Sequence, residues 1–161
     1  MLKKYEIIST YIIFILGSIL HFTYEYSNNN VVVSLFSSIN ESTWEHLKIL
    51  FYPMLLSTMI GYILFKNKYK YYLCNKVKGI ILSLLFIIIF FYTYTGVLGY
   101  NIALIDISSF FIAATLGQYY SYKNINKKCN NTIAFILIII LIISFTIFTF
   151  APPSIGLFKS P

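Results

Sequence analysis

The chain has 161 residues, of which 58% are hydrophobic and only 11% are charged, whereas charged residues make up about a quarter of an ordinary soluble domain. Twelve basic residues, all of them lysine, face five acids, so the formal net charge is +7. The lysines form short blocks between long apolar runs, which argues against nucleic-acid binding and is typical of a multispanning membrane protein. Arginine is absent and Ile, Asn, Lys, Tyr and Phe are abundant, a bias typical of AT-rich bacterial genomes.

Five apolar runs are long enough to cross a bilayer, because about 20 residues rising ~1.5 Å each span a hydrocarbon core of roughly 30 Å. They are residues 7–24, 47–65, 79–98, 102–120 and 132–150. The apolar run 31–36 is too short to cross, so we expect an interfacial or re-entrant segment there. The pattern predicts an all-α, polytopic membrane helix bundle of about five transmembrane helices, with residues 1–161 forming a single transmembrane domain.

The lysines near the span ends predict the orientation, because cytoplasmic loops carry an excess of them. With the N-terminus inside, ten of the twelve lysines are cytoplasmic and only Lys48 and Lys159 lie outside. We therefore predict a multi-pass protein of the cytoplasmic membrane, N-in and C-out, with an extracytoplasmic tail at 151–161 that either covers the outer face or is disordered. Cys74 and Cys129 would then be reduced, unrelated thiols, since cytoplasmic thiols stay reduced and neither residue has metal-site spacing.

Four of the five acids and both histidines gather on the outer side of this topology. These residues are His21, Glu25, Glu41, Glu45, His46 and Asp106. Ionisable groups in a bilayer usually face a bundle interior or a wet cavity and mark functional sites. Asp106 is the deepest, and it shares a stripe with the small residues Ser109, Ala113 and Gly117, which predicts that it points toward a neighbouring helix. His21 and Glu25 share a face with Gly17, another point of close approach.

Mixed imidazole and carboxylate groups suit zinc, manganese or non-haem iron, and a catalytic metal needs about three protein ligands and a position for water. The predicted ligands are His21, Glu25, Glu41, Glu45 and His46, and the predicted catalytic groups are Glu45, His46 and Asp106. In this hypothesis Glu45 is the general base for a metal-activated water. Glu45 and His46 are about 100° apart on a helix, so one atom cannot contact both without irregular backbone. Pro53 frees the carbonyl of Ile49 and permits a kink beneath the cluster.

Structural roles are open for the same residues. Two pairs have capping-box spacing, Ser38 with Glu41 and Ser42 with Glu45. Trp44 fits an interfacial aromatic belt. Glu45 could form an i, i+3 ion pair with Lys48, and His21 could form a hydrogen-bonded pair with Glu25. Three functions therefore stay open: a metal-dependent enzyme or ligand-binding protein that takes a lipid or small molecule from the outer leaflet, a proton- or cation-coupled transporter component, and a non-catalytic scaffold.

One block is distinctive, and it carries a resemblance. Its residues are His21, Tyr24 and Glu25, then Asn40-Glu-Ser-Thr-Trp-Glu-His-Leu-Lys and Phe51-Tyr-Pro, followed at the end by Pro152-Pro153, Leu157-Phe158 and Pro161. They resemble a family of small, uncharacterised bacterial integral membrane proteins with an N-E-S-x-W-E-H-L-K block, although Ser160 stands where we expect an acid. The resemblance implies the membrane class and singles out the His and Glu residues, and it brings no activity with it.

Overall fold

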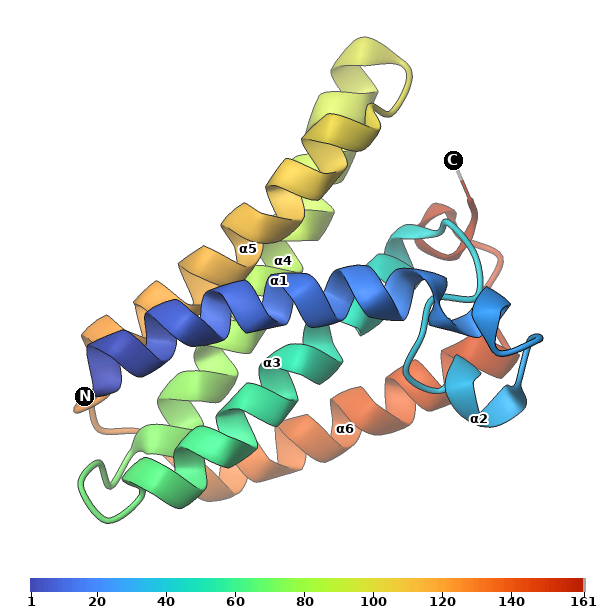
Figure 1. Ribbon diagram of the computed structural model, residues 1–161. Helices are drawn as coiled ribbons and strands as arrows, with labels where there is room; N and C mark the ends of the chain where they lie inside the picture. Colours follow the sequence, from blue (N-terminus) through green and yellow to red (C-terminus); the bar gives the residue numbers. More distant parts are fainter. Residues whose placement is uncertain (161) are drawn as a thin grey trace.

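The computed structural model describes residues 1–160, and all its regular elements in this range are helices, with no strand (Figure 1). Its elements are α1 (Leu2–Tyr26), α2 (Val31–Ser34), α3 (Thr43–Phe65), α4 (Tyr72–Leu98), α5 (Ala103–Asn124), α6 (Asn131–Phe150) and the 3-10 turn η1 (Gly156–Phe158). Four helices, α1, α3, α4 and α6, are long and apolar enough to cross a membrane. The helical class is therefore as expected. Helix α5 is comparable in length but carries Asp106, Gln118 and Lys123, so the fifth span stays a prediction.

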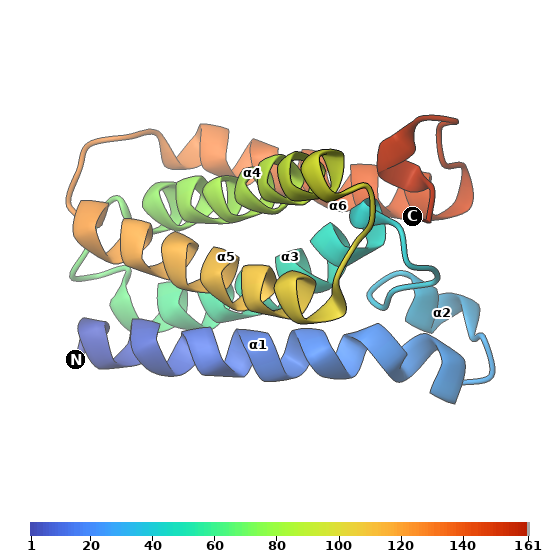
Figure 2. The same ribbon diagram turned by 90° about the horizontal axis from the view of Figure 1, so that it is seen from above.

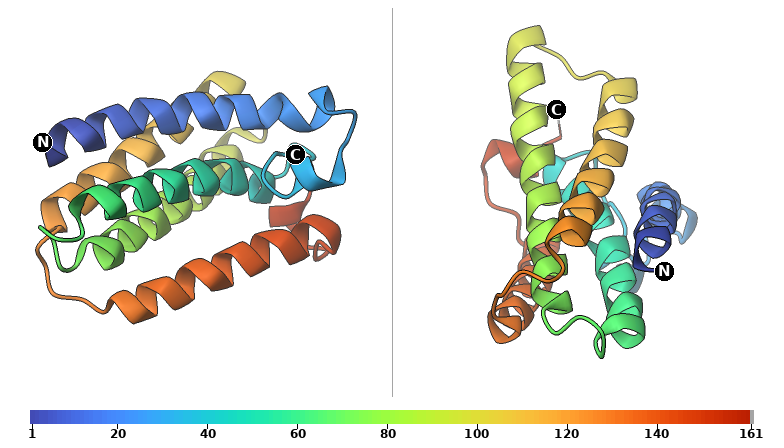
Figure 3. Two further views of the ribbon diagram at one scale, coloured as in Figure 1. Left: turned by 60° about the horizontal axis from the view of Figure 1, so that its bottom comes forward. Right: turned by 90° about the vertical axis from the view of Figure 1, so that its left-hand side faces the viewer.

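Helix α3 lies at the centre of the bundle. Most of its apolar stretch is buried, whereas α1, α4 and α6 bury only a minority of theirs. Helices α1 and α4 both pack against α3, α5 lies against α1 and α4, and α6 packs on α4 (Figures 2 and 3). Large apolar side chains cover the outside, among them Ile15, Ile63, Ile89, Leu104 and Ile139. An apolar surface that extends over every long helix is what a bundle surrounded by lipid presents.

Small residues bring α4 and α5 together. The predicted ridge of Ser109, Ala113 and Gly117 is buried, and a Cβ atom built on Gly117 would lie 2.7 Å from the carbonyl oxygen of Gly79. Ser83 Oγ donates a hydrogen bond across the contact to the carbonyl of Ala113, at 2.7 Å. Close backbone approach of this kind supports helix association in membranes, where lipid removes the hydrophobic driving force between helices. Beyond the contact, the turn joining α4 to α5 projects from the rest of the bundle (Figure 1).

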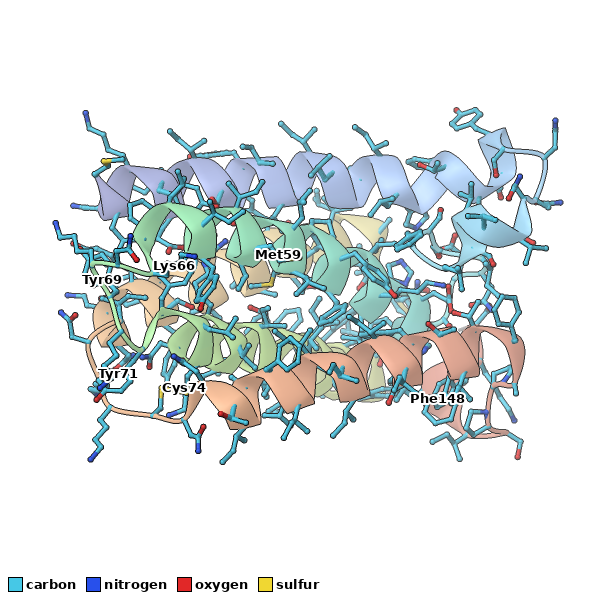
Figure 4. The ribbon with its side chains drawn as sticks, turned by 90° about the horizontal axis from the view of Figure 1, so that it is seen from below. Met59, Lys66, Tyr69, Tyr71, Cys74 and Phe148 are labelled. Carbon is cyan, nitrogen blue, oxygen red and sulfur yellow. A yellow bond between two sulfur atoms is a disulfide. The ribbon has the colours of Figure 1, made fainter. Side chains whose placement is uncertain are left out.

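The two ends of the bundle differ in composition. The loops after α3 and α5 lie at one end, where Figure 4 shows Lys66, Tyr69, Tyr71 and Cys74, and Phe148 lies toward the other. The latter end also holds the end of α1, the start of α3 and the tail (Figures 1 and 3). The lysine-rich loops are thus separated from the histidines, as expected. Which end faces the cytoplasm stays a prediction.

The expectation of two unrelated thiols is wrong, because Cys74 and Cys129 are joined in a disulfide at the lysine-rich end. Asn131 explains how they meet. Its side chain accepts a hydrogen bond from the backbone N–H of Cys74 (3.1 Å) and donates one to the carbonyl of Lys70 (2.8 Å), so the start of α6 is held against the start of α4. The spacing of the two cysteines in the sequence does not predict the disulfide, because the contact depends on how α4 and α6 pack.

The tail folds back on Trp44. The ring of Trp44 lies 4.8 Å from that of Phe158 and 4.7 Å from that of Phe145 between centroids. Trp44 therefore packs inside an aromatic cluster that joins α3, α6 and η1. This contact secures the tail on the α6 side of α3.

Replacing Gly117 by Ala should destabilise the α4–α5 pair, because the added methyl meets the backbone of Gly79 and the side chains of Ser83 and Met54. We expect a loss of about 1–3 kcal/mol of stability, as for other overpacked contacts, measured by thermal unfolding in detergent. The matched control is Gly96→Ala, on the projecting part of α4, where the methyl meets nothing within 4 Å. Equal stability of the two variants would contradict the role of this contact.

Candidate metal centre

Three of the predicted ligands meet at one end of the bundle: His21 near the end of α1, Glu41 in the loop before α3, and His46 in the first turns of α3. Glu41 Oε2 lies 3.4 Å from His21 Nε2 and 3.7 Å from His46 Nε2, and one ligand atom from each of the three lies within 4.8 Å of the others. Ligands at ~2.0–2.1 Å from a tetrahedral zinc are about 3.3 Å apart. The two distances to Glu41 are already close to this spacing, and the two histidines must come within it of each other to hold one ion.

The loop that carries Glu41 is held by the cap of α3. Ser42 is the N-cap, and its hydroxyl accepts a hydrogen bond from the backbone N–H of Glu45 (3.4 Å). The side chain of Asn40 accepts one from the N–H of Ser42 (2.9 Å). These bonds satisfy donors that the helix leaves free. Glu41 lies between the two capping residues with its side chain 63% exposed, so its carboxylate is free to reach both histidines.

Hydrogen bonding determines the tautomer of His46. Its Nδ1 lies 2.9 Å from the carbonyl oxygen of Ser42, and because a carbonyl only accepts, Nδ1 carries the proton. Nε2 is therefore the ring nitrogen that faces Glu41. Histidines that bind metals commonly donate their other N–H to a backbone carbonyl in this way. The Nδ1 atom of His21 is buried and has no protein partner, and its ring packs 5.2 Å from that of His46.

A cavity of about 540 Å³ lies beside the three ligands, well within the roughly 300–1,000 Å³ typical of small-molecule sites. Its walls come from α1, α3 and the projecting ends of α4 and α5. Most of the lining is apolar, including Phe14, Phe22, Ile49, Ile87, Phe91 and Phe110. The chain therefore places a group of candidate metal ligands at one end of a mostly apolar cavity.

Gly17 and Pro53 shape the wall between α1 and α3. A Cβ atom built on Gly17 would lie 3.2 Å from the carbonyl oxygen of Ile49 and 2.8 Å from Cε1 of Phe110. Pro53, inside α3, has no N–H to donate to Ile49. The predicted close approach at Gly17 is thus confirmed, and it occurs where α3 has a free carbonyl.

Asp106 lines the same cavity but stands apart from the three ligands. Tyr94 of α4 donates a hydrogen bond to Asp106 Oδ1, and Ser109 donates one to its backbone carbonyl (2.8 Å). Asp106 therefore points toward a neighbouring helix, as its small-residue stripe predicts. It contributes a carboxylate to the cavity from the α5 side.

Glu45 and Glu25 do not join the ligand group. The carboxylate of Glu45 is 2% exposed, lies 2.6 Å from Lys48 Nζ and accepts the N–H of Ile39 at 3.0 Å. The i, i+3 ion pair is therefore confirmed, and the roles of Glu45 as general base and metal ligand have no support in its geometry. Glu25 is exposed, and within residues 1–160 no hydrogen bond or ion pair connects it to His21. The 100° step between Glu45 and His46 explains why only His46 faces α1.

Lys48 connects three helices. Its ammonium group is fully buried, and besides Glu45 it contacts the carbonyl of Ser34 in α2 (2.8 Å) and the hydroxyl of Thr149 in α6 (2.9 Å). All three of its N–H donors therefore have a partner. Because His46 lies between Glu45 and Lys48 in the same helical turn, this network also holds the candidate ligand in place.

A second buried polar group lies toward the lysine-rich end, and the apolar runs did not predict it. Lys76 Nζ lies 2.7 Å from Glu6 Oε2 and also donates to the side chain of Gln118. Helices α1 and α4 begin several residues before the apolar runs of the sequence. Both charges therefore lie inside the bundle, where they pair, instead of in a loop.

Replacing Lys48 by Met should strongly destabilise the fold, because it leaves the Glu45 carboxylate buried without its partner. Removing one member of a buried pair costs about 3–5 kcal/mol, which thermal unfolding should detect. The double variant Lys48→Met with Glu45→Gln should recover part of this loss, and Lys66→Met, at an exposed lysine, should have little effect. A single Lys48→Met variant as stable as Lys66→Met would contradict this role.

Comparisons with known proteins bring no activity. No curated protein and no solved structure matches the chain. A family model of unknown function matches residues 1–161. The whole chain thus belongs to the family DUF6512.

Proposed function

We propose that this chain is a multi-pass protein of the cytoplasmic membrane whose functional centre is a divalent metal ion, with zinc the best fit, bound by His21, Glu41 and His46. In this proposal it is a metal-dependent enzyme that acts on a molecule entering from the outer leaflet. The observation that carries the proposal is the meeting of two imidazole nitrogens at one carboxylate oxygen, at 3.4 and 3.7 Å.

The three ligands fit a catalytic metal ion better than a structural one. Two histidines and one glutamate are a ligand set of catalytic zinc sites, whereas structural zinc sites are closed by four protein ligands. Three protein ligands leave a tetrahedral ion one position for water or substrate, and the cavity lies beside it. A zinc ion in such a site supplies a water that ionises near neutral pH.

The other cavity carboxylate completes the proposed chemistry. Asp106 takes the role of general base that the sequence suggested for Glu45, because Asp106 lines the cavity whereas Glu45 is held by Lys48. Tyr94 holds one oxygen of Asp106 by a hydrogen bond, which leaves the other oxygen to take a proton. A general base must lie within hydrogen-bond reach of the proton it accepts, directly or through one water.

Purified protein should contain about one zinc ion per chain after exposure to zinc and removal of the excess, measured by mass spectrometry of the metal. His21→Ala and His46→Ala should each weaken binding by at least about tenfold, because losing a direct ligand costs no less than losing a group that orients one. The matched control is Glu25→Gln, one turn from His21 on the same helix, which should bind zinc normally.

Folded protein that takes up no zinc would contradict the metal centre and favour the scaffold alternative. Zinc binding that survives His21→Ala and is lost in Glu25→Gln would contradict the assignment of ligands. Asp106→Asn should leave zinc binding unchanged, since Asp106 stands apart from the ligands. Loss of zinc in that variant would contradict the separate role proposed for it.

The proposed orientation is tested by a reporter at the C-terminus. The N-in topology assigns the lysine-rich end to the cytoplasm and therefore places the C-terminus outside. A C-terminal reporter that is active only in the cytoplasm should be inactive, whereas the same reporter at the N-terminus should be active. An active C-terminal reporter would contradict the N-in orientation.

A further inference from the structure

We infer that the cavity binds an amphiphile with a single hydrocarbon chain and an anionic phosphate head, with the head at His21, Glu41 and His46 and the chain between α1, α3 and the α4–α5 hairpin. This inference rests on the proposed metal centre and names the class of molecule that it would act on. The observation behind it is that one cavity has the three candidate ligands at one end and a mostly apolar wall, in which Asp106 is the one further charged side chain among the described residues.

The apolar part of the wall suits a hydrocarbon chain. Phe14 and Gly17 of α1, Ile49 of α3, Ile87 of α4 and Phe110 of α5 line it, and they come from four helices that surround the space. Gly17 adds to the room, since any larger side chain there would meet Phe110. A cavity of about 540 Å³ is the size of a site for one small molecule, so it takes one chain and not a whole two-chain lipid.

The polar end suits an anionic oxygen. A divalent ion with two neutral histidines and one carboxylate carries a net positive charge and has a position for an oxygen ligand. A phosphate head offers anionic oxygens for that position.

The mouth of the cavity indicates where the molecule enters. Exposed members of the lining mark the mouth, and they include Ser18 and Phe22 of α1 and Ile107 of α5 along one side, with Glu41 and Asn101 at the polar end. The opening thus runs between α1 and α5, from exposed polar residues to exposed apolar ones. An amphiphile in a bilayer has the same polarity gradient, so it can enter sideways without turning over.

The test uses the full-length, zinc-loaded protein in phosphatidylcholine nanodiscs and a dodecyl phosphate that carries a photoreactive diazirine in its chain. Crosslinked peptides, mapped by mass spectrometry, should come from the cavity wall, in particular from residues 14–22 and 103–110. Unlabelled dodecyl phosphate should compete for labelling. Inorganic phosphate at the same concentration should not, because it lacks the chain that fills the apolar wall.

Two serines provide a matched pair of variants. Ser18 and Ser108 are both exposed and both donate to the carbonyl four residues earlier, at 2.9 and 2.7 Å, but only Ser18 lines the cavity. Ser18→Trp should lower the labelling of the cavity wall by about tenfold, equivalent to 1.4 kcal/mol, and Ser108→Trp should leave it unchanged. Ala103→Trp, across the mouth on α5, is the second blocking variant if Ser18→Trp does not fold.

The outcomes separate this inference from the metal centre, because zinc content is measured on the same samples. Bound zinc with equal labelling of the Ser18→Trp and Ser108→Trp variants would overturn the inference and leave the metal centre standing. Labelling that responds to Ser18→Trp in protein that takes up no zinc would contradict both the metal centre and the anionic head placed at it, and so overturns the inference as well. If inorganic phosphate competes for labelling and unlabelled dodecyl phosphate does not, the head site belongs to free phosphate. Crosslinks to a second chain would assign the cavity to a protein segment. Either result overturns the inference.

Discussion

The buried ammonium of Lys48 is the interaction on which the histidine end of this protein depends. An ion sealed from solvent is tolerated only when its charge and its hydrogen-bond donors are satisfied. Glu45, Ser34 and Thr149 satisfy them from α3, α2 and α6. Through one side chain, α3 is thus tied to α2 and α6, and the turn that carries His46 has a defined position.

Because buried Lys48 needs an acidic partner, Glu41 and Glu45 have different roles. Glu45 is committed to Lys48, and Ser42 and Asn40 hold the preceding loop so that Glu41 turns toward the histidines. Successive helical residues point about 100° apart, so Glu45 and His46 face different sides of α3. The start of α3 therefore combines a structural ion pair with a group of candidate metal ligands.

Close packing elsewhere makes room for the cavity. The Gly79–Gly117 contact brings α4 and α5 together along one part of their length, and their ends beyond it project from the bundle (Figure 1). Helix α1, approaching closely at Gly17, closes the space from the other side. The cavity thus forms beyond the close contacts at Gly117 and Gly17. Asp106 lies on one wall and His21 on the other.

Periodicity and composition by themselves determined the helical membrane class, the small-residue ridge on α5, the capping role of Ser42 and the separation of lysines from histidines. These follow from local rules, since helical spacing and apolar length depend only on neighbouring residues. Tertiary structure decided which acid meets the histidines, how Glu6 pairs with Lys76 and why Cys74 meets Cys129. Those partners are far apart in the chain, and only the packing of one helix against another brings them together.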